Sequence, residues 1–546
     1  MNCIYLYFVS ILSLCAVDAY AQNQTDYSNR QQLAQRVKTL ASRYPKWVKS
    51  QSMTKTLGGA DIWMLSIGSG ALEQKPAIAV VGGVEGGHLL GVELAIGFAE
   101  KLLANASQDS VQSLLEKQTF YVFPNMSPDA TEQYFAKLQY ERTGNDRPLD
   151  YDRDGLVGED GFDDLDGDGK ITWMRVADPS GKYLPNPKDP RSMITADPTK
   201  GQQGQYLLLR EGIDNDKDGN WNEDGFEGVA FNKNSTYNYK NFQPGAGEHA
   251  VSELENRALF DFLYDAFNVY AVVSFGPENN LSTPHQAGRG GEVAAPSASR
   301  RPGGRIITSW SEQDAQANAY VSSIYNNVVN LGKAPKTKSG NGNFTDWAYY
   351  HYGRLSFSTP GWWVSDSDND AVAAYLSWAN KEGVQNNFTA WKSISHPDFP
   401  NKSVEVGGVH PFLLKNPPYK MVDSLVQKHA DFIVRLAHLA PQITITDQQV
   451  EKLEGGLSRI KVKVSNSGTL PTLTQVGERS YFLKQLVVEA KLANGQKIWS
   501  GKARQTIGAL NGKESAEIEW LVQGSGKLII EAGSASSGRQ SIQVSL

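Results

Sequence analysis

The sequence predicts an α/β fold with a mixed sheet flanked by helices, followed by an all-β, immunoglobulin-like sandwich at the C-terminal end. Three observations carry this prediction. Short apolar runs bounded by glycine alternate with helical patterns, which is typical of a sheet covered by helices. A stretch dense in Asp and Gly interrupts this alternation and indicates an insertion. After Pro441 apolar and polar residues alternate with period two, which indicates antiparallel strands.

The first element is a helix, because apolar side chains recur every three to four residues from Leu33 to Tyr44 and Pro45 stops the pattern. Strands and further helices are assigned by the same tests of length and period. The predicted strands are 60–67, 77–84, 119–123 and 269–275, and the predicted helices are 89–103, 251–267, 312–331 and 418–439. The Gly, Pro, Ser and Arg-rich segment 288–305 is expected to be a surface loop.

The C-terminal module, residues 441–546, shows period-two alternation at Ile443 and Ile445 and again from Ile460 to Val464. Turn residues at 466–468 and 494–495 separate the runs. A module of about a hundred residues with this pattern fits an immunoglobulin-like sandwich. No site chemistry is visible in it, so a role as spacer, stabiliser or adhesion unit is expected.

Residues 1–21 have the features of a signal peptide. The apolar run 4–17 is too short to cross a bilayer, and the small residues Ala19 and Ala21 form the pattern of a signal-peptidase site. This segment would direct export of the chain to the periplasm or the extracellular space, with cleavage after Ala21. A buried N-terminal strand and lipidation of Cys15 are the alternatives. Both cysteines, Cys3 and Cys15, lie here, so the mature chain is expected to have no disulfide.

The composition excludes two classes of partner. The formal net charge is -6 and no polybasic segment is present, so neither nucleic acid nor an anionic membrane is an expected partner. No later segment has the apolar length of a transmembrane helix. With 546 residues, 40% of them hydrophobic, the chain is long enough for a large core and a smaller module.

Several short motifs follow one another along roughly residues 26–440. They are Arg43-Tyr-Pro-Lys-Trp-Val48, Gly58-Gly-Ala-Asp-Ile-Trp63, the strand and turn 77–88, Phe120-Tyr-Val-Phe-Pro-Asn125 with Ser127-Pro-Asp129, Phe231-Asn-Lys-Asn234, Ser252-Glu-Leu-Glu255, Asp346-Trp-Ala-Tyr349 and Leu355-Ser-Phe-Ser358. In this order the chain resembles the zinc carboxypeptidases, the family of carboxypeptidase A. The resemblance implies the fold of that family and peptide substrates.

The family holds zinc with a His-x-x-Glu pair on the turn after its second strand and with a distant His. Here the turn reads Glu85-Gly-Gly-His88, so the two ligand types have the same spacing but are exchanged. Carboxylate oxygen and imidazole nitrogen both bind zinc at about 2.0–2.2 Å. The resemblance therefore implies Glu85 and His88 as zinc ligands, and a glycine-rich turn with two polar residues and no metal is the alternative.

Two other catalytic positions of the family are changed. Gly276 stands where the third ligand is expected, and Glu278 or His285 would replace it if the loop bends back. Pro360 stands where the general base is expected. A metal-bound water would then lack the group that takes its proton, a role commonly worth about 10²–10⁴-fold in rate. Glu278 is the candidate substitute for this base, and ordinary solvated loop residues are the alternative.

The residues that grip a substrate's terminal carboxylate also differ from the family pattern. Asn232 and Lys233 align with an Asn-Arg element, and Lys233 keeps the charge without the bidentate fork of Arg. The other changed positions are Gly87, in place of an Arg, and Lys338, in the loop that offers a Tyr in the family. Arg142 or Arg147 would serve instead, with a solvated surface Arg as the alternative.

Three acidic runs in the insertion, at about 145–228, have the spacing of calcium loops. Oxygen ligands at positions 1, 3 and 5 with Gly at 6 are what an EF-hand loop needs. The runs are Asp150, Asp152, Asp154 and Gly155; Asp164, Asp166, Asp168 and Gly169; and Asp214, Asp216, Asp218 and Gly219. Position 12 lacks the bidentate Glu, because it holds Gly161, Arg175 and Gly225. The candidate replacements are Glu159, Asp160, Asp163, Glu223, Asp224 and Glu227.

Calcium would have a structural role here, clamping an insertion too polar to form its own core. A solvated acidic loop is the alternative. Three functions follow from the whole sequence. The first is an exported zinc metallocarboxypeptidase whose domain spans 22–440, with a degenerate site. The second is a non-catalytic pseudopeptidase that binds a peptide or a glycan. The third is a calcium-dependent surface or adhesion module.

Overall fold

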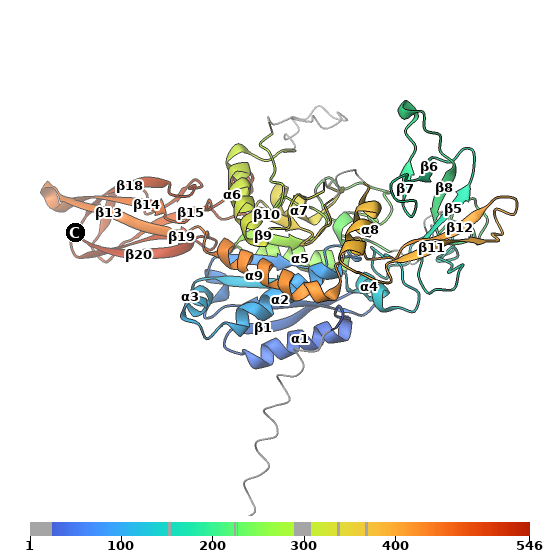
Figure 1. The fold of residues 1–546 in the computed structure, drawn as a ribbon. Helices are drawn as coiled ribbons and strands as arrows, with labels where there is room; N and C mark the ends of the chain where they lie inside the picture. Colours follow the sequence, from blue (N-terminus) through green and yellow to red (C-terminus); the bar gives the residue numbers. More distant parts are fainter. Residues whose placement is uncertain are drawn as a thin grey trace, which may run out of the picture.

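A six-stranded mixed sheet forms the centre of the protein (Figure 1). The structure is a computed structural model that describes residues 25–150, 154–222, 225, 228–288, 307–335, 339–365 and 370–546. The strands across the sheet are β1 (Val48–Lys55), β2 (Asp61–Ile67), β4 (Thr119–Phe123), β3 (Ala77–Val81), β9 (Val269–Phe275) and β10 (Leu355–Thr359). β1, β2 and β4 pair in antiparallel fashion, whereas β4, β3, β9 and β10 run parallel. The predicted mixed sheet is confirmed.

Helices cover both faces of this sheet. One face carries α1 (Arg30–Arg43), α2 (Leu89–Ala104), α3 (Asp109–Lys117), α6 (Glu312–Val329), α8 (Ala371–Lys381) and α9 (Val422–Ala437), and the other carries α5 (Leu254–Asp265) and α7 (Phe344–Tyr350). Successive residues of a strand point to opposite faces, so Ile78 and Val80 of β3 enter the first core while Ala79 and Val81 enter the second. The sheet is therefore buried on both sides, as its apolar strands predict.

A second sheet, which was not predicted, is built from the Asp and Gly-rich stretch and a later hairpin. Its strands in order are β11 (Phe388–Ile394), β12 (Val404–Val409), β5 (Trp173–Ala177), β8 (Tyr206–Arg210), β6 (Tyr183–Pro185) and β7 (Met193–Thr195). Met174, Val176, Val404 and Val406 pack with Phe399 in a buried cluster. The stretch thus shares a small core with β12, whereas the sequence indicated a segment too polar to form a core of its own.

The C-terminal strands form two four-stranded antiparallel sheets at the end of the molecule opposite the second sheet (Figure 1). One contains β13 (Ile443–Lys452), β14 (Leu457–Asn466), β18 (Ser515–Gln523) and β16 (Lys497–Ser500), and the other contains β17 (Arg504–Ile507), β15 (Leu486–Lys491), β19 (Lys527–Ser534) and β20 (Gly538–Ser545). Side chains from both sheets form one buried cluster around Trp520. The short helix α10 (Gln475–Glu478) meets the first domain, where the buried Asp314 accepts hydrogen bonds from the Tyr349 hydroxyl at 2.8 Å and the Gln475 amide at 3.0 Å.

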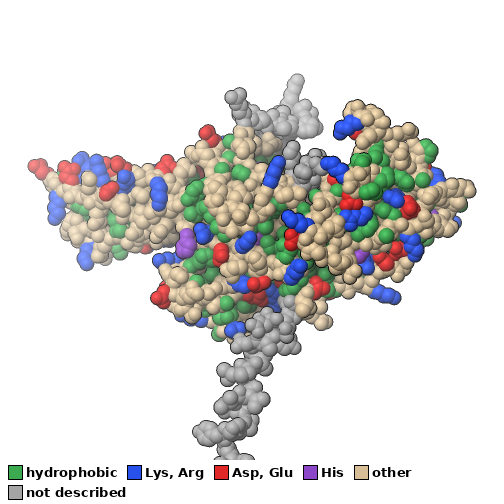
Figure 2. Space-filling view, viewed as in Figure 1, with side chains coloured by type: hydrophobic (Ala, Val, Ile, Leu, Met, Phe, Trp, Pro, Cys, Tyr) green, Lys and Arg blue, Asp and Glu red, His purple; other side chains and the backbone are tan. Residues whose placement is uncertain are grey.

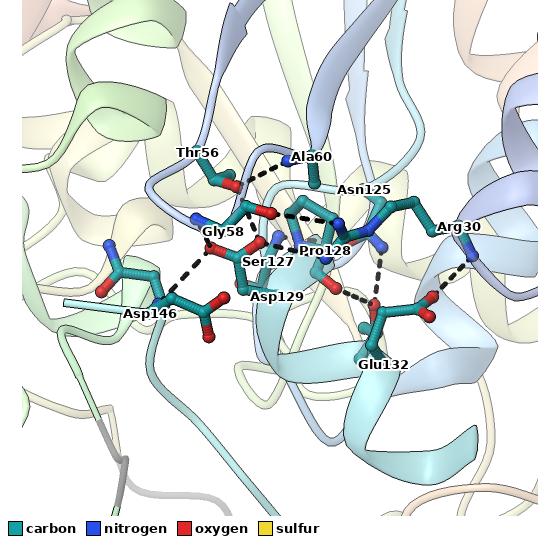
Figure 3. Close-up of polar contacts among 12 residues, drawn as sticks. Arg30, Thr56, Gly58, Ala60, Asn125, Ser127, Pro128, Asp129, Glu132 and Asp146 are labelled. Carbon is teal, nitrogen blue, oxygen red and sulfur yellow. Dashed lines mark hydrogen bonds and ion pairs between the residues drawn. The ribbon is translucent and has the colours of Figure 1, made fainter. Parts of the chain in front are cut away.

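The turn after β4 is fastened by a buried carboxylate on the short helix α4 (Pro128–Thr131) (Figure 3). Asp129 accepts hydrogen bonds from the Thr56 hydroxyl at 2.7 Å and from the Gly58 amide at 3.3 Å. Arg30 at the start of α1 lies 3.4 Å from the same carboxylate. This network ties the β1–β2 hairpin and α1 to the end of β4, and its role is structural.

Two predicted segments fall outside the part of the chain that the structure describes. These are the signal peptide, 1–21, and nearly all of the predicted loop 288–305. Within the described residues, no helix is both long and apolar enough to cross a membrane. Figure 2 shows lysine, arginine and acidic side chains interspersed over the visible face.

Candidate active site

The ends of three neighbouring parallel strands bring the predicted site positions to one edge of the central sheet. β9 pairs with β10 so that Phe275 lies opposite Thr359, and β3 lies on the other side of β9. The next residues are Gly276 and Pro360, and the Gly276 amide donates to the Thr359 carbonyl at 3.1 Å. The turn with Glu85 and His88 follows β3. Ligands of such sheets bind beyond the carboxyl ends of the strands, so this edge is the candidate site.

An ammonium group of the same chain holds the carboxylate of Glu85. Lys415 Nζ lies 2.6 Å from Glu85 Oε1 and 3.1 Å from Glu141 Oε2. Burial raises the pKa of Glu85, but the charge and the hydrogen bond of Lys415 outweigh burial, and the pKa lies below its ordinary value. The pKa of Glu141 is lowered against burial in the same way. Burial lowers the pKa of Lys415, but the two carboxylates outweigh burial and the pKa lies above its ordinary value. All three groups are therefore charged at neutral pH.

The imidazole of His88 is buried and binds the backbone beyond β10. His88 Nε2 lies 2.9 Å from the carbonyl oxygen of Pro360. A carbonyl oxygen only accepts, so this contact requires the proton on Nε2. Burial lowers the pKa of His88, and the ring is neutral at pH 7. The nitrogen that faces the end of β10 is therefore used as a donor.

Glu278 fills the space beside Gly276. A Cβ atom at Gly276 would lie 3.6 Å from Glu278 Oε2, so this carboxylate lies beside the position of the expected third ligand. The Glu278 carboxylate accepts hydrogen bonds from Asn232 Nδ2 at 3.3 and 3.4 Å and is 6% exposed. Burial, with the nearby charges of Asp346 and Glu85, raises the pKa of Glu278 to about 7.

The cations proposed to bind a substrate carboxylate already have partners. Lys233 Nζ donates to the Pro244 carbonyl at 3.1 Å. Arg142 is buried in an ion pair with Asp146, and Arg147 binds Glu253 at 2.9 Å. Neither arginine is the solvated surface group that was the alternative. His285 stacks on Trp310 at 4.9 Å, and Lys338 lies outside the described residues.

The expected zinc ligands at this edge do not bring three donor atoms around one point. A catalytic zinc site needs three protein ligands around one point, and its metal would supply an activated water. Among the described residues, Glu85, His88 and Glu278 do not form a group whose donor atoms lie within 4.8 Å of one another. Glu85 Oε1 binds an ammonium and His88 Nε2 binds a carbonyl, so each of these two atoms has a partner within the chain.

The three acidic loops share one local geometry. In each, the amide of the Gly at position 6 donates to the Asp at position 1. The pairs are Gly155 to Asp150 at 3.0 Å, Gly169 to Asp164 at 2.8 Å and Gly219 to Asp214 at 3.1 Å. These glycines have φ values of 100°, 80° and 99°, in the region that favours glycine. The fifth-position residues Asp154, Asp168 and Asp218 each accept from the amide two residues later.

Two groups of acidic side chains bring oxygen atoms within 4.8 Å of one another in the described part of the chain. One is Asp164, Asp166 and Glu211, and the other is Asp214, Asp216 and Asp218. Glu211, which was not predicted, is fully buried and accepts from the amides of Leu165 and Thr172 at 2.8 and 3.0 Å. Asp160 and Asp163 instead bind Asn215. Asp152, Glu223, Asp224 and Glu227 lie outside the described residues.

A family model described as zinc carboxypeptidase matches residues 33–360, the region that contains the sheet and this edge. The chain belongs to the zinc carboxypeptidase family. A second family model, described as a domain of unknown function, matches residues 442–545 of the same chain. No curated protein matches the chain.

Several solved structures are similar to this zinc carboxypeptidase family member. Carboxypeptidase A from Helicoverpa armigera is 11% identical with a TM-score of 0.41, over 77% of this chain and 78% of that chain. Thrombin activatable fibrinolysis inhibitor is 12% identical with a TM-score of 0.38, over 75% of each chain. The bovine form, in complex with tick carboxypeptidase inhibitor, is 12% identical with a TM-score of 0.37, over 76% and 99%. These scores are low, so the family assignment rests on the sequence match.

Sequence reasoning missed Lys415, Glu141 and Glu211 in this zinc carboxypeptidase family member. Lys415 is 330 residues away from Glu85 in the chain, and it lies beyond the segment matched by the zinc carboxypeptidase model. No motif or spacing connects the two. The acidic runs could have drawn attention to Glu211, because it precedes the third run by three residues.

Proposed function

We propose that the protein is an exported member of the zinc carboxypeptidase family that binds peptide C-termini but has a degenerate site for their hydrolysis. The observation that carries this proposal is the 2.9 Å hydrogen bond between His88 Nε2 and the Pro360 carbonyl. It joins a candidate metal ligand to the residue at the general-base position. The carbonyl of Pro360 cannot take a proton from water, and His88 Nε2 already carries one.

The chemistry of the neighbouring residues supports the same proposal. Gly276 offers no side chain at the third ligand position. Loss of a general base alone commonly costs about 10²–10⁴-fold in rate, and losses within one catalytic unit are not additive. Peptide binding is the function that family membership supports when the family's reaction is lost.

Residual hydrolysis is the second candidate function, and the contact between Asn232 and Glu278 favours it. Asn232 holds the Glu278 carboxylate at the place of the third ligand, and a base whose pKa is about 7 suits proton transfer near neutral pH. A non-catalytic glycan-binding cleft and a calcium-dependent adhesion role of the acidic loops and the C-terminal sheets remain weaker alternatives.

Binding is tested by fluorescence anisotropy with a labelled peptide that ends in a free carboxylate and with its C-terminal amide. We expect the free acid to bind more tightly and Lys233→Met to weaken that preference. Lys240→Met, an exposed lysine of the same segment, is the matched control. Equal affinity for acid and amide would contradict recognition of the C-terminus.

We further propose that calcium binds the acidic loops in a structural role. The repeated Gly-to-Asp turn and the two convergent acidic groups support this. The two C-terminal sheets around one core support an immunoglobulin-like sandwich. The division at 440/441 is supported by the matched ranges 33–360 and 442–545. Export by residues 1–21 rests on their sequence pattern.

A further inference from the structure

The segment 412–416, which we call the clamp, is fastened to the turn that carries Glu85 and His88. Asn416 Nδ2 donates to the Gly87 carbonyl at 2.9 Å, and its Oδ1 accepts from the Leu90 amide at 2.9 Å. Asn416 thereby satisfies an amide in the first turn of α2, which begins at Leu89. The Phe412 amide donates to Glu141 at 3.0 Å. The clamp therefore holds both the turn and the second carboxylate that Lys415 binds.

The absence of a side chain at Gly87 leaves room for the clamp. A Cβ atom at Gly87 would lie 3.7 Å from Lys415 Nζ, 3.9 Å from Phe412 Cδ1 and 4.0 Å from Glu141 Cγ. These are ordinary contact distances, so a methyl group fits but a long side chain would need the space of the ammonium. Phe412 is buried and has a φ of 70°, a conformation that a bulky residue keeps only where its surroundings hold it.

The charges around the clamp require a cation at this point. The side chains of Glu85 and Glu141 are only 20% and 17% exposed, and two carboxylates so placed repel each other unless a cation lies between them. Lys415 is within hydrogen-bond distance of both. Arg210 also lowers the pKa of Glu141, whereas His88 is neutral and adds no charge.

We infer that Lys415 is the built-in cation of this turn and stands between Glu85 and Glu141 where a divalent metal would otherwise bind. Its removal opens a divalent-cation site on these two carboxylates. The inference deepens the proposed function and rests on it, because it concerns the same altered edge of the sheet. It accounts for the ammonium partner of Glu85 at a position where a zinc ligand is expected. The metal ligand position is kept, but its partner is an amino group of the chain.

Zinc binding by equilibrium dialysis tests the inference, with excess calcium present to fill the acidic loops. Four proteins are compared: the wild type, Glu85→Gln, Lys415→Met and the Lys415→Met/Glu85→Gln double variant. We expect equal zinc in the wild type and Glu85→Gln, a gain of about one equivalent in Lys415→Met, and loss of that gain in the double variant. Zinc bound by the wild type and lost in Glu85→Gln would overturn the inference, and so would no gain in Lys415→Met.

Thermal melting provides the second measurement. Lys415→Met should lower the melting temperature, and adding Glu85→Gln should restore part of it, because the second change removes the unbalanced charge. Gly87→Ala is the control that leaves the clamp in place. If Lys415→Met does not fold, the wild type and Glu85→Gln still decide whether Glu85 binds zinc. If the wild type cleaves peptides but binds no zinc through Glu85, the result contradicts the proposed function alone. If the wild type binds zinc through Glu85 but does not cleave peptides, the result contradicts this inference alone.

Discussion

Glu253 and Glu255 lie close together in the protein interior, and the Nδ2 group of Asn145 donates a hydrogen bond of 2.7 Å to each. Arg147 also binds Glu253 at 2.9 Å. Glu255 Oε2 is buried and has no hydrogen-bond partner among the described residues. Burial, with the nearby charge of Glu253, raises the pKa of Glu255 to about 7. One carboxylate of the pair is thus paired with a cation, and the other is stable when protonated.

The first prediction is that Glu255 makes stability depend on pH. Its pKa is about 7 in the folded protein against an ordinary value of 4.5, so its contribution is full below about pH 4.5 and is lost as the pH rises through 7. Glu255→Gln mimics the protonated form. It should equal the wild type in acid and exceed it by on the order of 3 kcal/mol above pH 7. Urea unfolding across this range measures the difference, with the exposed Glu382→Gln as control. An unchanged pH slope in Glu255→Gln would contradict the assignment.

The second prediction concerns the acidic loops. Chelation of calcium should lower the melting temperature, because an ion that binds only the folded state stabilises it by mass action. Asp216→Ala should reproduce part of this loss and make the remaining melting curve less sensitive to the chelator. Asp261→Ala on an exposed position of α5 is the control. A melting curve that does not respond to the chelator would show that these loops are solvated acidic turns.

The third prediction is that Gly58→Ala destabilises the turn shown in Figure 3. A Cβ atom at Gly58 would overlap the Asp146 carboxylate and lie 2.6 Å from Asp129 Oδ1. We expect a loss of about 1–3 kcal/mol in the free energy of unfolding, measured by urea denaturation. Gly340→Ala, where a Cβ atom would meet nothing within 4 Å, should have little effect. Equal stability of the two variants would show that the Asp129 network is not as tight as described.

The fourth prediction concerns export. N-terminal sequencing of secreted protein should begin at Gln22, because Ala19 and Ala21 form the expected signal-peptidase site. A retained N-terminus before Ala19, or a lipid on Cys15, would require a different account of the first segment.

The central sheet could be predicted because its inner strands carry strong signals. β3, β4 and β9 are buried at every residue, and continuous apolar runs are typical of a sheet covered on both faces. β1 lies at the edge and has one buried residue, Val48, so its sequence does not read as a strand. β5 mixes Trp173 and Arg175 with buried Met174 and Val176, and five residues are too few to show a period. The second sheet was missed for this reason.

The candidate site was predictable only in part. The spacing of Glu85 and His88, and the positions of Gly276 and Pro360, follow from the order of motifs. The partners of these residues do not, because they depend on which distant segment packs against the strand ends. Lys415 reaches Glu85 only through the packing of the clamp. Likewise, Glu278 could be named as a neighbour of Gly276, but its hydrogen bond to Asn232 required the fold.

The measurement that tests the central claim most directly is hydrolysis of peptides with a free C-terminal residue, with zinc supplied and with the zinc content of each protein determined. The proteins to compare are the wild type, Glu85→Ala/His88→Ala and Glu278→Gln. Our account predicts very slow or no release of the C-terminal residue by the wild type, and no further change in the variants. Rapid cleavage by the wild type that is lost in both variants would show that the exchanged residues form a working site, and would contradict the account.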